Sequence, residues 1–249
     1  MTIIKSAEEI AIMREAGRIV AIVLQRMSQA VKPGIKTRQL NDLAEKELGS
    51  WKEARASFKG YNGFPASICV SVNDEIVHGI PDNRVLKEGD IVSLDFGVLF
   101  KGFQGDAAIT VGVGQVSAEA IRLMEVARTS LMQGIASARE GGTLGDIGAA
   151  IQTYVEQRGY NVVREYSGHG IGRDMHEDPL VPNFGTRGDG LKLKEGMTLA
   201  LEPMVNAGGW KTRQNANGWT VHTADHSLSA HFEHTIAIRS GEAQILTMP

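Results

Sequence analysis

The sequence predicts an α+β fold made of two related halves, and two internal matches in the same order support this prediction. SAEEIAIMREA at residues 6–16 resembles SAEAIRLMEVA at 117–127, with 6 identities in 11 positions. LKEGDIVSLDFGV at 86–98 resembles LKEGMTLALEPMV at 193–205, with 6 identities in 13 positions. A single match of this kind could arise by chance, but two collinear matches favour a duplicated architecture.

The first half is predicted to contain two helices followed by strands. Ser6 and Glu9 have the spacing of a capping box at the start of the first helix. Thr37 is the expected N-cap of the second helix, which Gly49 ends. Runs rich in apolar and β-branched residues predict strands at 66–77 and 91–99, with a hairpin partner at 103–113.

The second half repeats this order. Its helices are expected near 117–138 and 144–158, and its strands near 161–166, 197–205 and 232–238. No linker or low-complexity segment separates the two halves, which cover approximately 1–113 and 114–249. We therefore expect a single domain over 1–249, with helices on one face of the sheet and polar residues on the other.

Composition excludes several classes of function. The chain has 249 residues and a net charge of -3, which argues against nucleic-acid binding because phosphate contacts need a basic patch. No apolar run is long enough for a membrane span, and the start MTIIKSAEEI lacks the features of a signal peptide. Cys69 is the only cysteine, so no intrachain disulfide is expected. These features predict a cytoplasmic protein that does not bind membranes.

The hairpin LDFGVLFKGFQGDAAITV carries two acidic residues among apolar ones. If residues 99–102 form its turn, Asp95 lies directly opposite Asp106, with Cβ atoms about 5 Å apart. Two ionised carboxylates at that distance repel, so either one holds a proton or cations lie between them. A proton-sharing dyad and an ordinary structural salt bridge are the alternatives to a metal site.

Other acids and histidines favour the metal site. Glu202 aligns with Asp95 in the internal match, and Glu233 precedes an apolar strand as Asp106 does. Four clustered carboxylates need compensating charge, which two divalent ions about 3.5–4 Å apart would supply. His78, His169 and His176 lie beside glycines and could act as ligands or acid–base groups. Four further histidines are expected mostly at the surface or in hairpins, with His231 a weak candidate for the cleft: His222, His226, His231 and His234.

These residues resemble the motifs of bacterial-style type I methionine aminopeptidases. The matching set is Asp95, Asp106 eleven residues later, His169 in GHGIG, Glu202 in EPM and Glu233 in FEHT, together with VHGIP and MHEDP. The resemblance covers essentially the whole chain. It implies the pita-bread fold, which is a duplicated α+β unit with a curved antiparallel sheet, covering helices and an internal pseudo-two-fold axis. It also implies removal of initiator methionine from nascent proteins whose second residue is small.

The resemblance implies a role for each ligand. Asp95 would chelate one metal ion, Asp106 and Glu233 would bridge both, and His169 and Glu202 would complete the ligand set of the second ion. A bridging water or hydroxide would be the nucleophile, and Glu202 would also be the general base. The two ions per chain would be Co, Mn, Fe(II) or Zn.

The resemblance also assigns residues to the substrate. His176 would hydrogen-bond the scissile carbonyl or the oxyanion, and His78 would contact the scissile amide nitrogen. The apolar wall for the methionine side chain would consist of Tyr61, Phe64, Cys69 and Trp219, with Met175 and His78 nearby. For the aromatic residues, ordinary core packing is the alternative. The partners would be peptides and nascent chains with N-terminal methionine. The enzyme would act as a monomer, and transient association with the ribosome is compatible with this role.

Two rival functions remain. An Xaa-Pro aminopeptidase or prolidase shares the ligand set, but such enzymes usually carry a further N-terminal domain, and the first capping box here begins at residue 6. A non-enzymatic binding protein with the same fold would lose metal ligands, whereas all five are present here. Cleavage rates of a methionyl peptide and an Xaa-Pro peptide distinguish a methionine aminopeptidase from the first rival. Analysis of bound metal distinguishes a metalloenzyme from the second.

Overall fold

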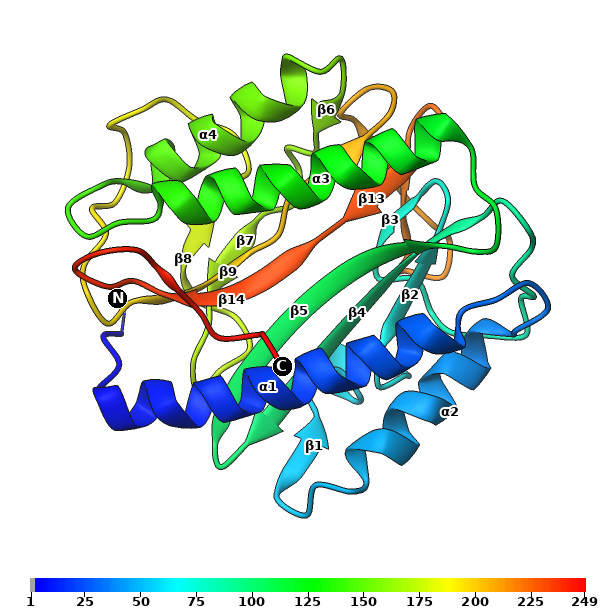
Figure 1. Cartoon of the computed structure of the whole chain (residues 1–249), viewed down its shortest axis with the longest axis horizontal. Helices are drawn as coiled ribbons and strands as arrows, with labels where there is room; N and C mark the ends of the chain where they lie inside the picture. Colours follow the sequence, from blue (N-terminus) through cyan, green and yellow to red (C-terminus); the bar gives the residue numbers. More distant parts are fainter. Residues whose placement is uncertain (1–2) are drawn as a thin grey trace.

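Four helices lie against a large antiparallel sheet in the computed structural model, which describes residues 3–249 (Figure 1). The first two residues of the predicted first half lie outside this range. The helices are α1 (Ala7–Ala30), α2 (Thr37–Leu48), α3 (Ala118–Ser137) and α4 (Leu144–Glu156), and a short 3₁₀ turn, η1, covers Tyr61–Gly63. The α+β class predicted from the sequence is therefore confirmed.

The central sheet has nine strands, and its main path mixes strands from both halves of the chain. The path runs β1 (Ala54–Ala56), β4 (Ile91–Phe100), β5 (Phe103–Gly112), β14 (Glu233–Ala237), β9 (Thr198–Leu201), β7 (Gly168–Gly170) and β8 (Glu177–Val181). Two strands pair beside this path: β2 (Cys69–Val72) with β4, and β15 (Gln244–Ile245) with β14. Strands β5 and β14 join the two halves at the centre of the molecule.

Two three-stranded sheets complete the fold. One consists of β13 (Ser229–His231), β10 (Met204–Asn206) and β6 (Asn161–Val162). The other consists of β11 (Thr212–Gln214), β12 (Val221–Thr223) and β3 (Glu75–Val77). Across residues 3–249, no helix is long and apolar enough to cross a membrane.

The predicted helix starts were right for α1 and wrong for α2. The Glu9 amide donates to Ser6 Oγ at 3.2 Å and the Ser6 amide donates to Glu9 Oε2 at 2.9 Å, which completes the capping box. Helix α2 instead has Lys36 as its N-cap, and the Lys36 amide donates to the Gln39 side chain. Thr37 does not act as the cap, because its hydroxyl accepts from the Asp82 amide at 2.9 Å.

Two predicted strands are broken in the structure. The stretch 66–77 divides into β2 and β3 around Asn73, whose φ of 59° turns the chain. The stretch 197–205 divides into β9 and β10 at Glu202 and Pro203, because proline has no amide hydrogen to continue the ladder. The expected strand at 161–166 is limited to Asn161–Val162.

The turn of the central hairpin differs from the predicted one. Phe100 pairs with Phe103, so the turn contains only Lys101 and Gly102, whose φ values of 48° and 82° suit a type I′ turn. The predicted pairing of Asp95 with Asp106 was therefore wrong by two residues: Asp106 faces Gly97, and Asp95 faces Ala108. A shift of two residues preserves the side-chain face, so both acids still lie on the same side of the hairpin.

The opposite face of the hairpin packs closely against α1. A Cβ atom at Gly105 would lie 2.7 Å from the backbone nitrogen of Gly17, so neither the strand nor the helix can accommodate a side chain without moving. Helix α1 packs on β4 and β5, while α3 contacts β5, β9, β10, β13 and β14. The helices thus pack against one face of the sheet, and the face that carries the acids is left open to form a pocket.

We expect Gly105→Ala to lower the free energy of unfolding by about 1–3 kcal/mol, because the new methyl group must separate α1 from β5. Urea unfolding followed by circular dichroism measures the change. Gly241→Ala is the matched control, since nothing lies within 4 Å of a Cβ atom at that exposed position. Equal midpoints for Gly105→Ala and Gly241→Ala would contradict the close packing described above.

Candidate metal centre

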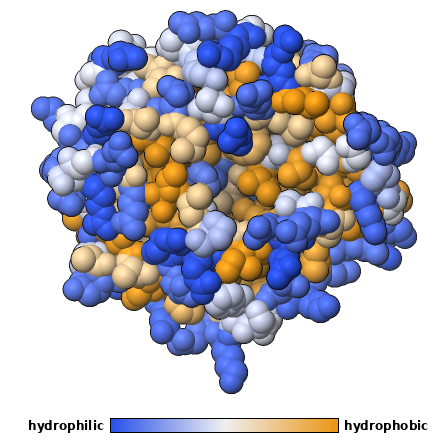
Figure 2. Space-filling model, viewed as in Figure 1, coloured by the Kyte–Doolittle hydropathy of each residue, from blue (hydrophilic) through white to orange (hydrophobic). Residues whose placement is uncertain are grey.

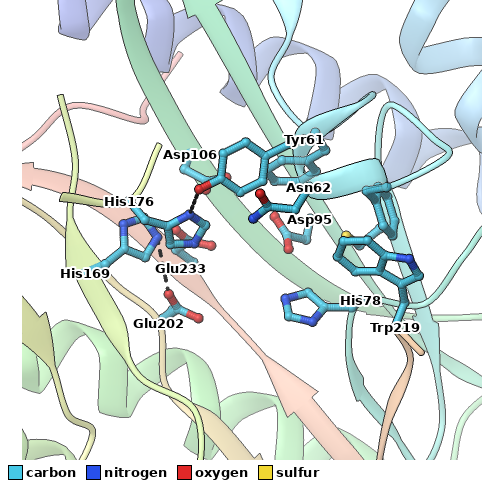
Figure 3. Close-up of a pocket in the computed structure, with 13 residues that line it drawn as sticks. Tyr61, Asn62, His78, Asp95, Asp106, His169, His176, Glu202, Trp219 and Glu233 are labelled. Carbon is cyan, nitrogen blue, oxygen red and sulfur yellow. Dashed lines mark hydrogen bonds and ion pairs between the residues drawn. The ribbon is translucent and has the colours of Figure 1, made fainter. Parts of the chain in front are cut away.

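One pocket collects every site residue predicted from the sequence (Figure 3). Its wall contains acids, histidines and aromatic residues from both halves of the chain. The lining residues are Phe58, Tyr61, Asn62, Phe64, Cys69, His78, Asp95, Asp106, His169, His176, Glu202, Trp219 and Glu233. The space-filling view, by contrast, shows mixed polar and apolar residues on the outer surface (Figure 2).

Three adjacent strands place three carboxylates on the floor of this pocket. Ala108 of β5 pairs with Asp95 of β4 on one side and with Glu233 of β14 on the other. Directly opposed residues share a face, so both acids point to the same side as Ala108. Asp106 lies on the same face of β5, two residues before Ala108. The small side chain of Ala108 leaves space between the carboxylates.

His169 and Glu202 approach this floor from the neighbouring strands. His169 of β7 pairs with Ala200 of β9, and Glu202 follows directly after β9. The Nδ1 atom of His169 lies 2.9 Å from its acceptor, the Gly170 carbonyl oxygen, so Nδ1 carries the proton. The Nε2 lone pair is then free on the side of Glu202 Oε1, at 3.6 Å. A backbone carbonyl that fixes the tautomer in this way is typical of metal-binding histidines.

The electrostatics of the acidic cluster call for a cation. Burial raises the pKa of Asp95 to about 7. Burial, followed by the charges of neighbouring acids, raises the pKa values of Asp106, Glu202 and Glu233 well above their usual range. Within the part of the chain that the structure describes, Asp95 Oδ1, Asp106 Oδ1 and Glu233 Oε1 are buried without a hydrogen-bond partner.

The geometry of these groups fits a divalent metal ion. Asp106, His169 and Glu233 each offer one ligand atom, and these atoms lie within 4.8 Å of one another. Oxygen ligands with one imidazole suit divalent first-row metals. Cys69 lies directly opposite Asp95 in the β2–β4 pairing. Burial, and then the nearby acids, raise the pKa of the Cys69 thiol well above its usual range.

Two further histidines border the acidic floor. Burial lowers the pKa of His78 to about 4, so its imidazole is neutral near pH 7. Its ring meets the edges of Tyr166 and Trp219. His176 lies with its ring centroid 4.2 Å from that of His169, and burial lowers its pKa as well. The two histidines therefore present neutral imidazoles to whatever occupies the pocket.

The four residues of the predicted apolar wall all line the pocket. Phe64 and Cys69 are buried, and the Phe64 ring meets Trp219 edge to face at 5.1 Å. Tyr61, 37% exposed, lies at the mouth. Met175, expected near this wall, packs over Gly97 beside the lining residue Phe58, and both side chains would lie 2.8 Å from a Cβ atom at Gly97.

His231, the weak candidate for the cleft, lies directly behind the acidic floor. It is 2% exposed, and among the described residues its Nε2 has no hydrogen-bond partner and lies 3.8 Å from Glu202 and 3.9 Å from Glu233. Phe58 and Asn62 line the pocket without any motif in the sequence to mark them. None of the four further histidines is among the lining residues of the pocket in the described part of the chain: His222 and His226 contact Asp74, and His234 contacts Thr247.

Comparisons with known proteins match this chain over most of its length. The model of metallopeptidase family M24 matches residues 11–240. The chain is 51% identical over 247 residues to methionine aminopeptidase 1 of Bacillus subtilis, covering 99% of both chains. It is 44% identical to the methionine aminopeptidase of Thermotoga maritima, whose crystal structure superposes with a TM-score of 0.98 and full coverage of both chains. An Xaa-Pro dipeptidase from Bacillus anthracis shares the fold, with a TM-score of 0.77 and 22% identity over 99% of this chain and 62% of that one.

Proposed function

The chain belongs to metallopeptidase family M24, in its group of bacterial-type methionine aminopeptidases, and from this premise we propose how its pocket performs the reaction. The reaction is hydrolysis of the peptide bond that follows an N-terminal methionine. It takes place in the pita-bread fold that the chain shares with its solved relatives. One observation supports the proposal most strongly. A single pocket has an acidic floor that fits a metal ion and, directly beside it, an apolar wall.

The enzyme uses divalent metal, and we assign two ions to five residues of this chain. Asp95, Asp106, His169, Glu202 and Glu233 would hold them, and the unpartnered oxygens of three of these acids support the assignment. Co, Mn, Fe(II) and Zn all suit such a donor set. When bound, such ions polarise a carbonyl group and lower the pKa of water to about 7.

Glu202 would accept the proton of the attacking water. It follows a strand end rather than lying within a strand, and its side chain is 14% exposed, compared with 3% for Glu233. Burial, and then the charge of Asp95, raise the pKa of Glu202 well above its usual range, which favours uptake of a proton. The same proton would then pass to the departing amine nitrogen, near which we assign His78.

His176 supplies a hydrogen bond to the carbonyl oxygen on which negative charge develops. Its neutral imidazole lies beside His169, so the oxygen would lie next to the metal-binding residues. The methionine side chain would enter the wall of Phe64, Cys69 and Trp219, where aromatic rings and a thiol meet a thioether favourably. Cleavage requires a small second residue, as the family resemblance implies.

The remaining assignments concern the cellular context. All five proposed ligands come from one chain, so the site is complete in a monomer. We propose one catalytic domain over 1–249 with halves of approximately 1–113 and 114–249. It would act in the cytoplasm on nascent chains, with only transient contact with the ribosome.

The test is hydrolysis of Met-Ala-Ser by the metal-loaded protein, compared with Ala-Pro-Ser and N-acetyl-Met-Ala-Ser. We expect release of methionine from the first peptide alone, because the acetylated amine cannot enter as a free N-terminus. Preferential cleavage of Ala-Pro-Ser would identify a prolidase-type specificity instead. No turnover, together with no bound divalent metal by elemental analysis, would indicate a binding protein.

A further inference from the structure

We propose that Tyr61 is a positioning residue that fixes the tautomer of His176, so that the Nε2–H group of His176 faces the substrate carbonyl. The proposal rests on the proposed function, because it concerns how His176 donates its hydrogen bond. The Tyr61 hydroxyl oxygen lies 2.8 Å from His176 Nδ1, and Figure 3 shows this contact at the mouth of the pocket. The two rings also stack, with centroids 5.4 Å apart and planes inclined by 28°.

A tight turn holds Tyr61 in this position. The Tyr61 amide donates to the Phe58 carbonyl at 2.9 Å, and the Phe64 amide donates to the Tyr61 carbonyl at 2.9 Å. Asn62 takes a left-handed conformation with φ 47° and ψ 25°, which costs free energy for a residue with a side chain. Phe64 anchors the turn because it is 4% exposed. The backbone thus fixes where the Tyr61 side chain begins.

The Tyr61 hydroxyl is assigned as the donor in its contact with His176 Nδ1. Burial, and then the charge of Asp174, raise the pKa of Tyr61, so the hydroxyl keeps its proton near pH 7. A phenol hydroxyl donates more readily than a neutral imidazole N–H, and a neutral imidazole nitrogen accepts more readily than a phenol oxygen. The 2.8 Å contact is therefore strongest when the hydroxyl directs its proton to Nδ1.

The tautomer of His176 follows from this hydrogen bond. A neutral imidazole has one donor and one acceptor nitrogen, so an accepting Nδ1 leaves the proton on Nε2. Among the residues that the structure describes, His176 has no second side-chain hydrogen bond that would favour the other tautomer. Nε2–H is therefore available to a substrate carbonyl oxygen. His169 is fixed in the opposite sense, because its Nδ1 donates to a carbonyl and its Nε2 is free to bind metal.

Tyr61→Phe removes the hydroxyl and retains the ring, so it separates positioning from the apolar wall. We expect kcat for Met-Ala-Ser to fall about fivefold to tenfold, as for the loss of one hydrogen bond, with KM unchanged within about twofold. In the His176→Ala background, the same substitution should change kcat by less than about twofold, because the group it positions is absent. Tyr154→Phe, on α4 and outside the pocket, is the matched control.

The tautomer itself is observable without turnover. ¹⁵N chemical shifts of histidine-labelled, zinc-loaded protein should show His176 protonated at Nε2, and Tyr61→Phe should give a mixture of tautomers. A parent protein with His176 protonated at Nδ1 would overturn the proposal even if the enzyme is active. An equal loss of kcat in both backgrounds, or a change confined to KM, would also overturn it. Failure of the proposed function appears separately, as absence of Met-Ala-Ser cleavage by the parent.

Discussion

Glu202→Gln is expected to lower kcat for Met-Ala-Ser by about 10²–10⁴, the range for loss of general acid–base catalysis. Glutamine keeps one oxygen and the shape of the side chain but cannot accept the proton of the attacking water. Glu202→Ala should abolish turnover, since it removes the proposed ligand as well. The rates are measured with saturating metal by the release of free methionine.

Metal content distinguishes the two roles assigned to Glu202. We expect Glu202→Gln to keep more bound metal than Glu202→Ala when both are analysed by elemental spectrometry after dialysis. Glu242→Gln, at an exposed position outside the pocket, should retain parental rate and metal content. If Glu202→Gln kept more than a tenth of the parental kcat, the proton acceptor would have to be another group.

The second large effect concerns the stability of the metal-free protein. Asp95 has a folded-state pKa of about 7 against 3.8 when unperturbed, so between these values the folded state binds more protons than the unfolded state. Its contribution to stability is therefore complete below about pH 4 and is lost as the pH rises through about 7. A shift of this size corresponds to on the order of 4 kcal/mol.

Asp95→Asn removes this contribution, together with the rise that the charge of Asp95 causes in the pKa values of Asp106, Glu202 and Glu233. Both effects favour the variant as the pH rises, and the histidines of the site are common to both proteins. In the presence of a chelator, we expect the variant and parent to have similar Tm values at pH 4. The variant should become progressively more stable than the parent up to about pH 7.5. Differential scanning calorimetry across this range measures the difference, and exposed Asp42→Asn serves as the control.

Added Mn²⁺ should reverse the order at pH 7.5. The parent gains stability because metal binds the deprotonated carboxylates, whereas Asp95→Asn lacks one proposed ligand. The opposite result would be a difference in Tm between Asp95→Asn and the parent that, without metal, stays constant from pH 4 to pH 7.5. It would show that the fold does not stabilise the protonated form of the Asp95 carboxyl group.

The sequence predicted those parts of the structure that depend on local signals and on the alternation of side chains between the two faces of a strand. Ser6 and Glu9 marked the start of α1, because both halves of the capping box lie within one turn. The hairpin prediction placed Asp95 and Asp106 on the correct face despite the wrong register, since an error of two residues leaves the alternation unchanged. Glu202 was found through its alignment with Asp95 in the internal match, and Glu233 through its place before an apolar strand.

Features that depend on tertiary contacts could not be read in this way. The three-residue strand β7 carries His169 but is too short to show a period of its own. Met175 precedes His176 in the chain yet packs over Gly97, because a glycine in β4 leaves room there. His231 was only a weak candidate for the cleft because its burial comes from β10 and the central sheet, which are distant in sequence.

The row Asp95–Ala108–Glu233 also determines the width of the site. Neighbouring strands lie about 4.8 Å apart in any sheet, because backbone hydrogen bonds fix that spacing. The Cα atoms of the two outer acids are therefore held two strand spacings apart by the main chain, and only the side-chain rotamers change the distance between the carboxylates. Small changes of rotamer would adapt the proposed ligands to ions of slightly different radius while the strands stay in place. The site would then accept Co, Mn, Fe(II) or Zn without any change in the backbone.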